Sequence, residues 1–233
     1  KGKIIVAFAD TLFRADFKLD TAKDGIIWVQ KVKDPSQFGV VKLDSNGNIS
    51  ELVEKPTVFV SDLAIIGIYF FKDGEFLKNE MQYLLDNNIK ERGEYQFTTA
   101  LENMKRKGAK FVSGQVVEWL DCGNKDNMVL TNQRYLTFIK DQKLVASTAK
   151  SINSTIVPPV FLGENVIIEN STIGPFVSVG DSTVIKDSTI TNAIIQKNCV
   201  ISKAQLENAM FGNFVNFEGQ SSDASLGDYS VVR

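Results

Sequence analysis

A repeat of 17 residues in the C-terminal part of the sequence constrains the fold more than any other feature. Asn153-Ser-Thr-Ile156 recurs as Asn170-Ser-Thr-Ile173 and as Asp187-Ser-Thr-Ile190. Aliphatic residues divide each repeat into steps of six, six and five, at Ile156, Leu162, Ile168, Ile173, Val179, Ile185 and Ile190. The pattern continues less regularly through Ile195, Ile201, Leu206, Phe211 and Phe217. A fixed period of this kind is typical of stacked coils, so each repeat predicts one coil with three short sides.

Small and polar residues punctuate the repeat. Gly163, Gly174, Gly180 and Gly212 directly follow four of the predicted inward positions. Glycine and asparagine adopt positive φ most easily, so we expect both residue types at the corners of the coils. The alternative, a sandwich of short antiparallel strands, would need hairpin turns of irregular length. Residues 153 to 219 resemble the hexapeptide-repeat family, whose members form left-handed parallel β-helices, although the five-residue steps imply a tighter corner on one side.

Residues 1–145 have a different pattern, in which apolar runs alternate with amphipathic stretches. Strands are predicted at residues 3–8, 26–33, 40–43, 49–54, 64–71 and 116–120, and helices at residues 74–89, 97–107 and 125–140. The continuous apolar run of residues 64–71 is typical of a central strand buried on both faces. Strands that alternate with helices predict an α/β layer structure. We therefore expect a Rossmann-like sheet in a domain of residues 1–145 and a β-helix in residues 146–233.

Composition excludes several kinds of chemistry. The chain has no histidine, which excludes Ser-His-Asp and Cys-His catalysis and the common zinc sites. The net charge of -2 gives no reason to expect a nucleic-acid partner. No apolar run approaches the roughly 20 residues that span a bilayer, and no signal peptide is visible, so we expect a cytoplasmic protein. Its chemistry would use carboxylates, lysine and backbone groups.

Two aspartates follow predicted strands. Asp10 ends the string Ile4-Ile-Val-Ala-Phe-Ala-Asp10, and Asp121 follows Trp119-Leu120. Each alone is more often a turn or capping residue. Open α/β sheets place ligand groups at the carboxyl ends of their strands, so the two carboxylates would meet if both strands belong to one sheet. Two hard oxygen ligands suit a Mg²⁺ ion that also carries phosphate oxygens.

Five short blocks occur in a fixed order along the first 123 residues. They are Asp34-Pro-x-x-Phe38-Gly-Val-Val41, Glu54-Lys-Pro56, Gly67-Ile-Tyr69, Arg92-Gly-Glu94 and Trp119-Leu-Asp-Cys-Gly123. Each block alone is compatible with an ordinary hairpin, a core strand or a helix start with a threonine cap. In this order, from Asp10 through Asp121, they resemble the sugar-1-phosphate nucleotidyltransferase family, and its glucose-1-phosphate thymidylyltransferase branch in particular.

The resemblance implies the chemistry of the site. Asp10 and Asp121 would hold the catalytic Mg²⁺, and Lys55 with Arg92 would neutralise the sugar phosphate, with Lys55 also counted as catalytic. The sugar-phosphate oxygen would attack the α-phosphorus of a nucleoside triphosphate and release pyrophosphate. Positioning and charge neutralisation suffice for this step, so the lack of histidine is compatible with it.

The resemblance also implies residues that bind the sugar. The backbone of Gly39 and the carboxylate of Glu54 would hydrogen-bond sugar hydroxyls. Ile65 would contact the sugar through its backbone, and Tyr69 would border the pocket, although a buried core tyrosine is an equally good interpretation. Glucose 1-phosphate with dTTP or UTP is the expected substrate pair, and mannose and N-acetylglucosamine phosphates stay open.

Three expectations concern the protein as a whole. Family members begin with a Gly-rich loop and a Pro-Lys element that bind the triphosphate. We expect the segment that carries these elements, about 100 residues or roughly three βαβ units, to be missing by N-terminal truncation. The fragment alone would then be inactive. Ala9 stands where the family favours glycine, and Thr99 stands where aspartate is frequent. The flat sides and open ends of a β-helix favour a homo-oligomer.

Two alternative functions stay open. Hexapeptide β-helices often transfer acyl groups to sugars or nucleotide sugars, but those sites typically use a histidine base. A non-catalytic sugar-phosphate-binding or scaffold subunit is the other alternative.

Overall fold

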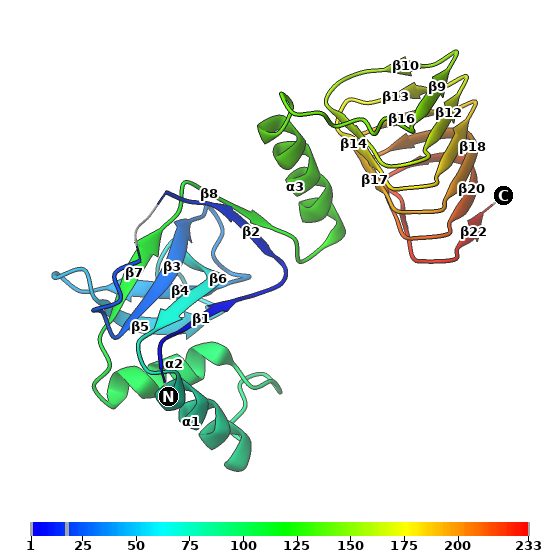
Figure 1. Cartoon of the computed structure of the whole chain (residues 1–233). Helices are drawn as coiled ribbons and strands as arrows, with labels where there is room; N and C mark the ends of the chain where they lie inside the picture. Colours follow the sequence, from blue (N-terminus) through cyan, green and yellow to red (C-terminus); the bar gives the residue numbers. More distant parts are fainter. Residues whose placement is uncertain (1, 17–18, 233) are drawn as a thin grey trace. The chain divides into compact units, whose positions relative to one another are not determined.

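The structure, a computed structural model that describes residues 2–16 and 19–232, divides into two compact units (Figure 1). The first unit is Lys1–Leu120 and the second is Asp121–Arg233. Helix α3 (Lys125–Phe138) thus packs with the β-helix, although the sequence pattern assigned it to the first domain. The expected domain boundary at residue 145 stays a prediction.

The first unit contains a mixed sheet, a two-stranded ribbon and two helices. Its elements are β1 (Ile4–Ala7), β2 (Thr11–Arg14), β3 (Gly25–Lys31), β4 (Gly39–Leu43), β5 (Ile49–Glu54), β6 (Leu63–Phe71), α1 (Gly74–Asp86), α2 (Phe97–Arg106), β7 (Phe111–Gln115) and β8 (Glu118–Asp121). The sheet has six strands in the order β5-β4-β6-β3-β7, with β1 paired to β6. β3 and β7 run parallel, whereas the other neighbours are antiparallel. The α/β class is therefore confirmed, with a mixed sheet.

Strand β6 is the centre of this sheet, as its apolar run predicts. Every residue from Ala64 to Phe71 is buried, because β1, β3 and β4 flank it and both faces are covered. On one face, Tyr69 and Phe71 pack in a core with Leu77 of α1 and Leu101 of α2. The other face forms a smaller core in which Phe70 joins residues of β3 and β8. Figure 1 shows α1 and α2 lying together on one side of the sheet.

The second unit joins α3 to a parallel β-helix. Its strands are β9 (Lys150–Ile152), β10 (Thr155–Ile156), β11 (Val160–Leu162), β12 (Ile167–Glu169), β13 (Thr172–Ile173), β14 (Val177–Val179), β15 (Val184–Lys186), β16 (Thr189–Thr191), β17 (Ala193–Ile195), β18 (Val200–Glu207), β19 (Met210–Phe211), β20 (Asn216–Ser222), β21 (Ser225–Leu226) and β22 (Val231–Val232). Strands β11, β14, β17, β19 and β21 form one side, so the solenoid has about five coils. The predicted left-handed β-helix is thereby confirmed, and its predicted inward residues from Leu162 to Phe217 are all buried.

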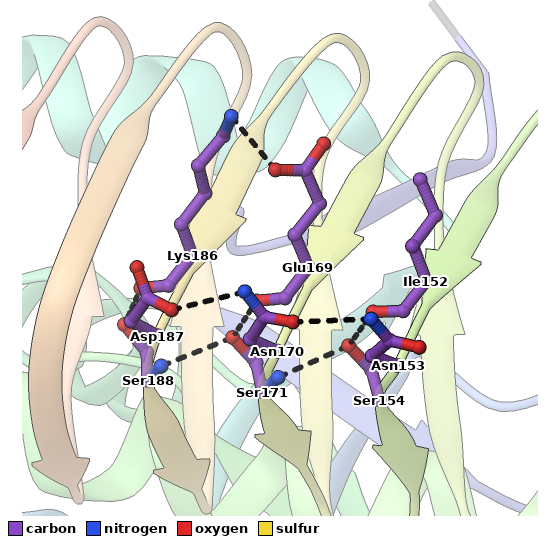
Figure 2. A network of polar contacts seen from close by, with 9 residues as sticks. All are labelled: Ile152, Asn153, Ser154, Glu169, Asn170, Ser171, Lys186, Asp187 and Ser188. Atoms are coloured by element: carbon purple, nitrogen blue, oxygen red, sulfur yellow. Dashed lines mark hydrogen bonds and ion pairs between the residues drawn. The ribbon is translucent and has the colours of Figure 1, made fainter.

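The repeated Asn-Ser and Asp-Ser strings form a hydrogen-bonded ladder along one corner (Figure 2). The hydroxyl of Ser171 donates to the carbonyl of Glu169 at 2.7 Å and accepts the N–H of Ser188 at 3.0 Å. Asn170 donates from its side chain to Asp187 of the next coil at 3.2 Å. Each serine therefore satisfies a backbone N–H of the following coil, which would otherwise be a buried, unpaired donor.

The role predicted for the glycines is only partly right. Asn153, Asn170 and Asp187 have φ near 48–49° and form one corner, as expected for residues that tolerate the left-handed region. Of the four glycines in the repeat, Gly174 alone has positive φ. A Cβ at Gly180 would lie 2.8 Å from the backbone carbon of Gln196 in the next coil. Glycine is needed there for close approach of two backbones, and not for its conformational freedom.

Candidate functional site

The backbone of Gly39 is closely packed where β4, β5 and β6 meet in the first unit. We call Gly39 together with the Glu54, Ile65 and Thr98 side chains around it the Gly39 cluster. Gly39 is the register partner of Glu54 across the β4–β5 hairpin. A Cβ at Gly39 would lie 2.9 Å from the Glu54 carboxylate, 3.1 Å from Thr98 and 3.3 Å from Ile65. The structure therefore brings together three residues singled out in the sequence, Gly39, Glu54 and Ile65. This close approach is possible because residue 39 has no side chain.

Thr98 is a member of the Gly39 cluster that the sequence pattern did not single out. Its hydroxyl donates to Oε2 of Glu54 at 3.1 Å, and the residue is only 5% exposed. The helix start was compatible with a threonine cap, but the N-cap residue of α2 is Gln96, which makes no side-chain cap bond. The only signal in the sequence is the position of Thr98 shortly after the Arg92-Gly-Glu94 block. The bond fixes one oxygen of Glu54 and leaves the other available to a ligand.

Tyr69 lies in an aromatic cluster near Glu54. It is 3% exposed, and burial, followed by the nearby Glu54 carboxylate, raises the pKa of its hydroxyl, which stays neutral. Its ring centroid is 4.9 Å from that of Phe97 and 5.5 Å from that of Phe8. The half-exposed ring of Phe8, which sequence reasoning missed, covers the left-handed residue Gly67. Tyr69 is thus a buried core tyrosine beside Glu54, and its contact with sugar stays a prediction.

Two cationic residues are in contact next to Glu54 in the sequence. The guanidinium of Arg92 donates to the backbone carbonyl of Lys55 at 2.9 Å. Both residues have left-handed backbones, with φ of 53° for Arg92 and 41° for Lys55. Such conformations cost about 1–3 kcal/mol in long side-chain residues and persist only where the surroundings hold them. The Arg92 loop is held by Glu91, which accepts a bond of 2.7 Å from the hydroxyl of Thr99. The threonine at position 99 therefore makes its own contact with this loop.

The Trp119 block packs against Phe38 of the first block and against Thr11, which directly follows Asp10. The indole N–H of Trp119 donates to the hydroxyl of Thr11 at 2.8 Å, and this hydroxyl donates to the carbonyl of Ile66 at 2.6 Å. The rings of Trp119 and Phe38 meet edge to face, with centroids 5.1 Å apart. Segments far apart in the sequence are thus joined directly, and the turn that carries Asp10 is tied to β6 through Thr11.

The two predicted metal ligands are associated with strands of different sheets. Asp10 is exposed in the turn between β1 and β2, three residues beyond the end of β1. Asp121 is the last residue of β8, which pairs with β2 in the separate ribbon. β1 and β8 thus belong to different sheets, while Asp10 directly precedes β2, the partner of β8; the meeting of the two carboxylates stays a prediction. Among residues 2–16 and 19–232, no group of three or more carboxylate or thiol side chains gathers as a ready-made metal site.

The donor set itself is compatible with a divalent cation. Oδ1 of Asp121 accepts the N–H of Gly123 at 2.9 Å, and Oδ2 contacts the side-chain amide of Asn127. Each carboxylate oxygen has more than one lone pair, so both can still bind an ion. Two aspartates supply the hard oxygen ligands that Mg²⁺ takes together with phosphate oxygens.

Comparison with known proteins identifies the class. The nucleotidyl transferase family model matches residues 4–137, which is more than half of the chain. This chain belongs to the nucleotidyl transferase family. It is 31% identical over 153 residues to a glucose-1-phosphate thymidylyltransferase of Streptomyces antibioticus, covering 59% of this chain and 41% of that protein. It is 31% identical over 141 residues to the low-salt glycan biosynthesis nucleotidyltransferase Agl11 of Haloferax volcanii, covering 60% and 37%.

A third relative is named as a bifunctional protein. The bifunctional protein GlmU of Methanocaldococcus jannaschii is 33% identical over 138 residues, covering 58% of this chain and 32% of that protein. The chain therefore spans about two fifths or less of the length of these relatives. No helix in the described part of the chain is long and apolar enough to cross a membrane.

Proposed function

We propose that the protein takes part in nucleotidyl transfer from a nucleoside triphosphate to a sugar 1-phosphate, which yields a nucleotide sugar and pyrophosphate. One observation carries this proposal: the Gly39 cluster, in which the Glu54 carboxylate lies against Gly39, while Arg92 is hydrogen-bonded to the backbone of Lys55, the residue after Glu54. A sugar 1-phosphate has the matching chemistry, because its hydroxyls donate hydrogen bonds to a carboxylate and its phosphate is anionic.

Each residue would have a separate task. The second carboxylate oxygen of Glu54 would accept hydrogen bonds from sugar hydroxyls, and the backbone of Gly39 would hydrogen-bond further hydroxyls. The backbone of Ile65 would contact the same ring. Lys55 and Arg92 would neutralise the phosphate, the first as a point charge and the second as a planar fork. The strained backbones of these two cations support this proposal, since such strain is usually found at functional sites.

Asp10 and Asp121 would hold the divalent cation. A bound Mg²⁺ would neutralise charge on the phosphates during transfer. The chain's own contribution is the presentation of two carboxylates, one from the turn after β1 and one from the end of β8. Asp121 is suited to this task because Gly123 and Asn127 fix its orientation.

Glucose 1-phosphate with dTTP or UTP is the substrate pair we propose. The support is the name of the thymidylyltransferase relative from Streptomyces antibioticus. Binding can be tested on this chain with glucose 1-phosphate as the titrant and ³¹P NMR as the readout. Glu54→Gln should weaken binding by about 10-fold or more, the usual value of a lost hydrogen bond to a charged group. Glu51→Gln is the matched control, because Glu51 lies on the same strand and is exposed. Equal affinities for the two variants would contradict the sugar assignment.

Turnover is tested on the full-length gene product. Pyrophosphate release from dTTP and UTP with glucose 1-phosphate should fall at least 100-fold in Asp10→Asn and in Asp121→Asn if each carboxylate holds the cation. Undiminished release in both variants would refute the metal assignment. Glucose 1-phosphate binding without any turnover would instead favour a sugar-phosphate-binding subunit, and calorimetric binding of acetyl-CoA would favour acyl transfer.

A further inference from the structure

Asp121 contacts helix α3 through both its side chain and its backbone carbonyl. The side-chain amide of Asn127 contacts Oδ2, and the hydroxyl of Thr131 donates to the carbonyl oxygen of Asp121 at 3.0 Å. Thr131 is 8% exposed, so this second bond is shielded from water. Asn127 and Thr131 are four residues apart and lie on one face of the helix. The position of α3 therefore helps to fix the position of the Asp121 carboxylate, together with the pairing of β8 with β2 and the N–H of Gly123.

Helix α3 is in turn fastened to the β-helix at two points. The amide oxygen of Asn132 accepts the hydroxyl of Ser178 on β14 at 2.6 Å. Near the start of the helix, the ammonium of Lys125 donates to the carbonyl of Asn208 at 3.3 Å and forms an ion pair with Asp223. The Lys125 side chain is 17% exposed, whereas that of Asp223 is 66% exposed. Both attachments come from polar side chains that have found partners on the coils.

The spacing of the two attachments matches the spacing of the coils. Lys125 and Asn132 are seven residues apart, which is about 10.5 Å along a helix. Asn132 also donates to the carbonyl of Phe176 at 3.4 Å. Phe176 and Asn208 occupy the same corner of the solenoid two coils apart, or about 9.6 Å. Because the two lengths agree, α3 can use both attachments without distortion while lying along the stack of coils.

We propose that the β-helix positions the metal ligand Asp121. It does so through the contacts that Asn132 and Lys125 of α3 make with the coils. This inference rests on the proposed function in one respect, namely that Asp121 binds the divalent cation. A carboxylate that is already held by a rigid support loses less conformational freedom when it binds an ion. The β-helix thus has a task in the reaction centre that is separate from assembly, and Asn132 is a positioning residue.

The test uses the full 233-residue chain and Mn²⁺ as a paramagnetic replacement for Mg²⁺. Mn²⁺ broadens the NMR signals of nearby amides, so the Mn²⁺ concentration that half-broadens Gly123 reports binding without turnover. Ser178→Ala removes the donor to Asn132 from the β-helix side. It should raise that concentration by about twofold to tenfold and speed amide exchange at Asn127 by a similar factor, the value of one hydrogen bond. Ser225→Ala, in the same outward column and exposed, should change neither.

Three outcomes separate the proposals. If Mn²⁺ binds more weakly to both Ser178→Ala and Asn132→Leu, and more weakly still to Asp121→Asn, the positioning role of the β-helix is supported. If Ser178→Ala keeps wild-type Mn²⁺ binding and amide exchange while Asp121→Asn loses binding, the positioning role of the β-helix is overturned. The proposed function is then left intact. If Mn²⁺ binding is unchanged in Asp121→Asn, both the metal assignment of the proposed function and the positioning role of the β-helix are overturned. If Asn132→Leu does not fold, Ser178→Ala alone decides.

Discussion

Replacing Gly180 by alanine tests the finding that the glycines of the repeat permit close approach of neighbouring coils. Gly180 does not have positive φ, so alanine can adopt its backbone conformation. The added Cβ would, however, lie 2.8 Å from the backbone carbon of Gln196 and 2.8 Å from the backbone nitrogen of Lys197. Both atoms belong to the backbone of the next coil, which cannot rotate away as a flexible side chain can.

The expected magnitude combines two opposing effects. Alanine restricts the unfolded chain more than glycine does, which stabilises the folded state by about 0.4–1 kcal/mol where the conformation is allowed. Overpacking of this kind costs about 1–3 kcal/mol. Gly227 occupies the same position of a later coil, and a Cβ there would meet nothing within 4 Å. Gly227→Ala should therefore stabilise the protein slightly, and Gly180→Ala should be about 1–3 kcal/mol less stable than Gly227→Ala.

Urea unfolding followed by far-UV circular dichroism measures this difference. With a denaturant dependence of about 2 kcal/mol per molar, a difference of about 2 kcal/mol separates the two midpoints by about 1 M. Comparison of the two alanine variants cancels the unfolded-state effect, because both replace glycine by alanine. Equal midpoints, or a more stable Gly180→Ala variant, would refute the close-approach explanation.

Two further predictions concern the polar ladders of the β-helix. Ser171→Ala leaves the buried N–H of Ser188 without its acceptor and should cost about 1–3 kcal/mol of unfolding free energy in urea titrations, more than Ser154→Ala at the less buried first coil; equal losses would contradict the ladder's role. The ammonium of Lys197, which hydrogen-bonds Asp181, and a backbone N–H hold the pKa of that carboxyl below its ordinary value of 3.8. Its stabilising contribution is therefore complete above about pH 4 and is lost as the pH falls through the lowered pKa. Asp181→Asn should flatten the acid side of the stability curve measured by thermal unfolding between pH 5 and 2, and an unchanged slope would rule this carboxyl out as a contributor.

The candidate site shows how far sequence reasoning reached. The family resemblance singled out Gly39, Glu54 and Ile65, and the structure packs the three closely together. Thr98 was missed as a partner of Glu54, because a threonine in the first turn of a helix is compatible with an ordinary local role. Phe8 was missed because an aromatic residue at the end of a strand carries no sign of the glycine it covers. The assigned roles of the site residues, and the expected homo-oligomer, stay predictions.

The sequence by itself determined the β-helix, its coil length and its inward residues. A period is a local property: each coil repeats the same burial problem, so the solution can be read from residue spacing alone. Only the tertiary structure decided that Gly180 is a glycine because another backbone lies against it, and that α3 packs with the solenoid. Such features depend on which distant segments come into contact, and the spacing of residues along the chain does not record those contacts. The attachment of Asp121 to the β-helix through Asn132 belongs to this second kind.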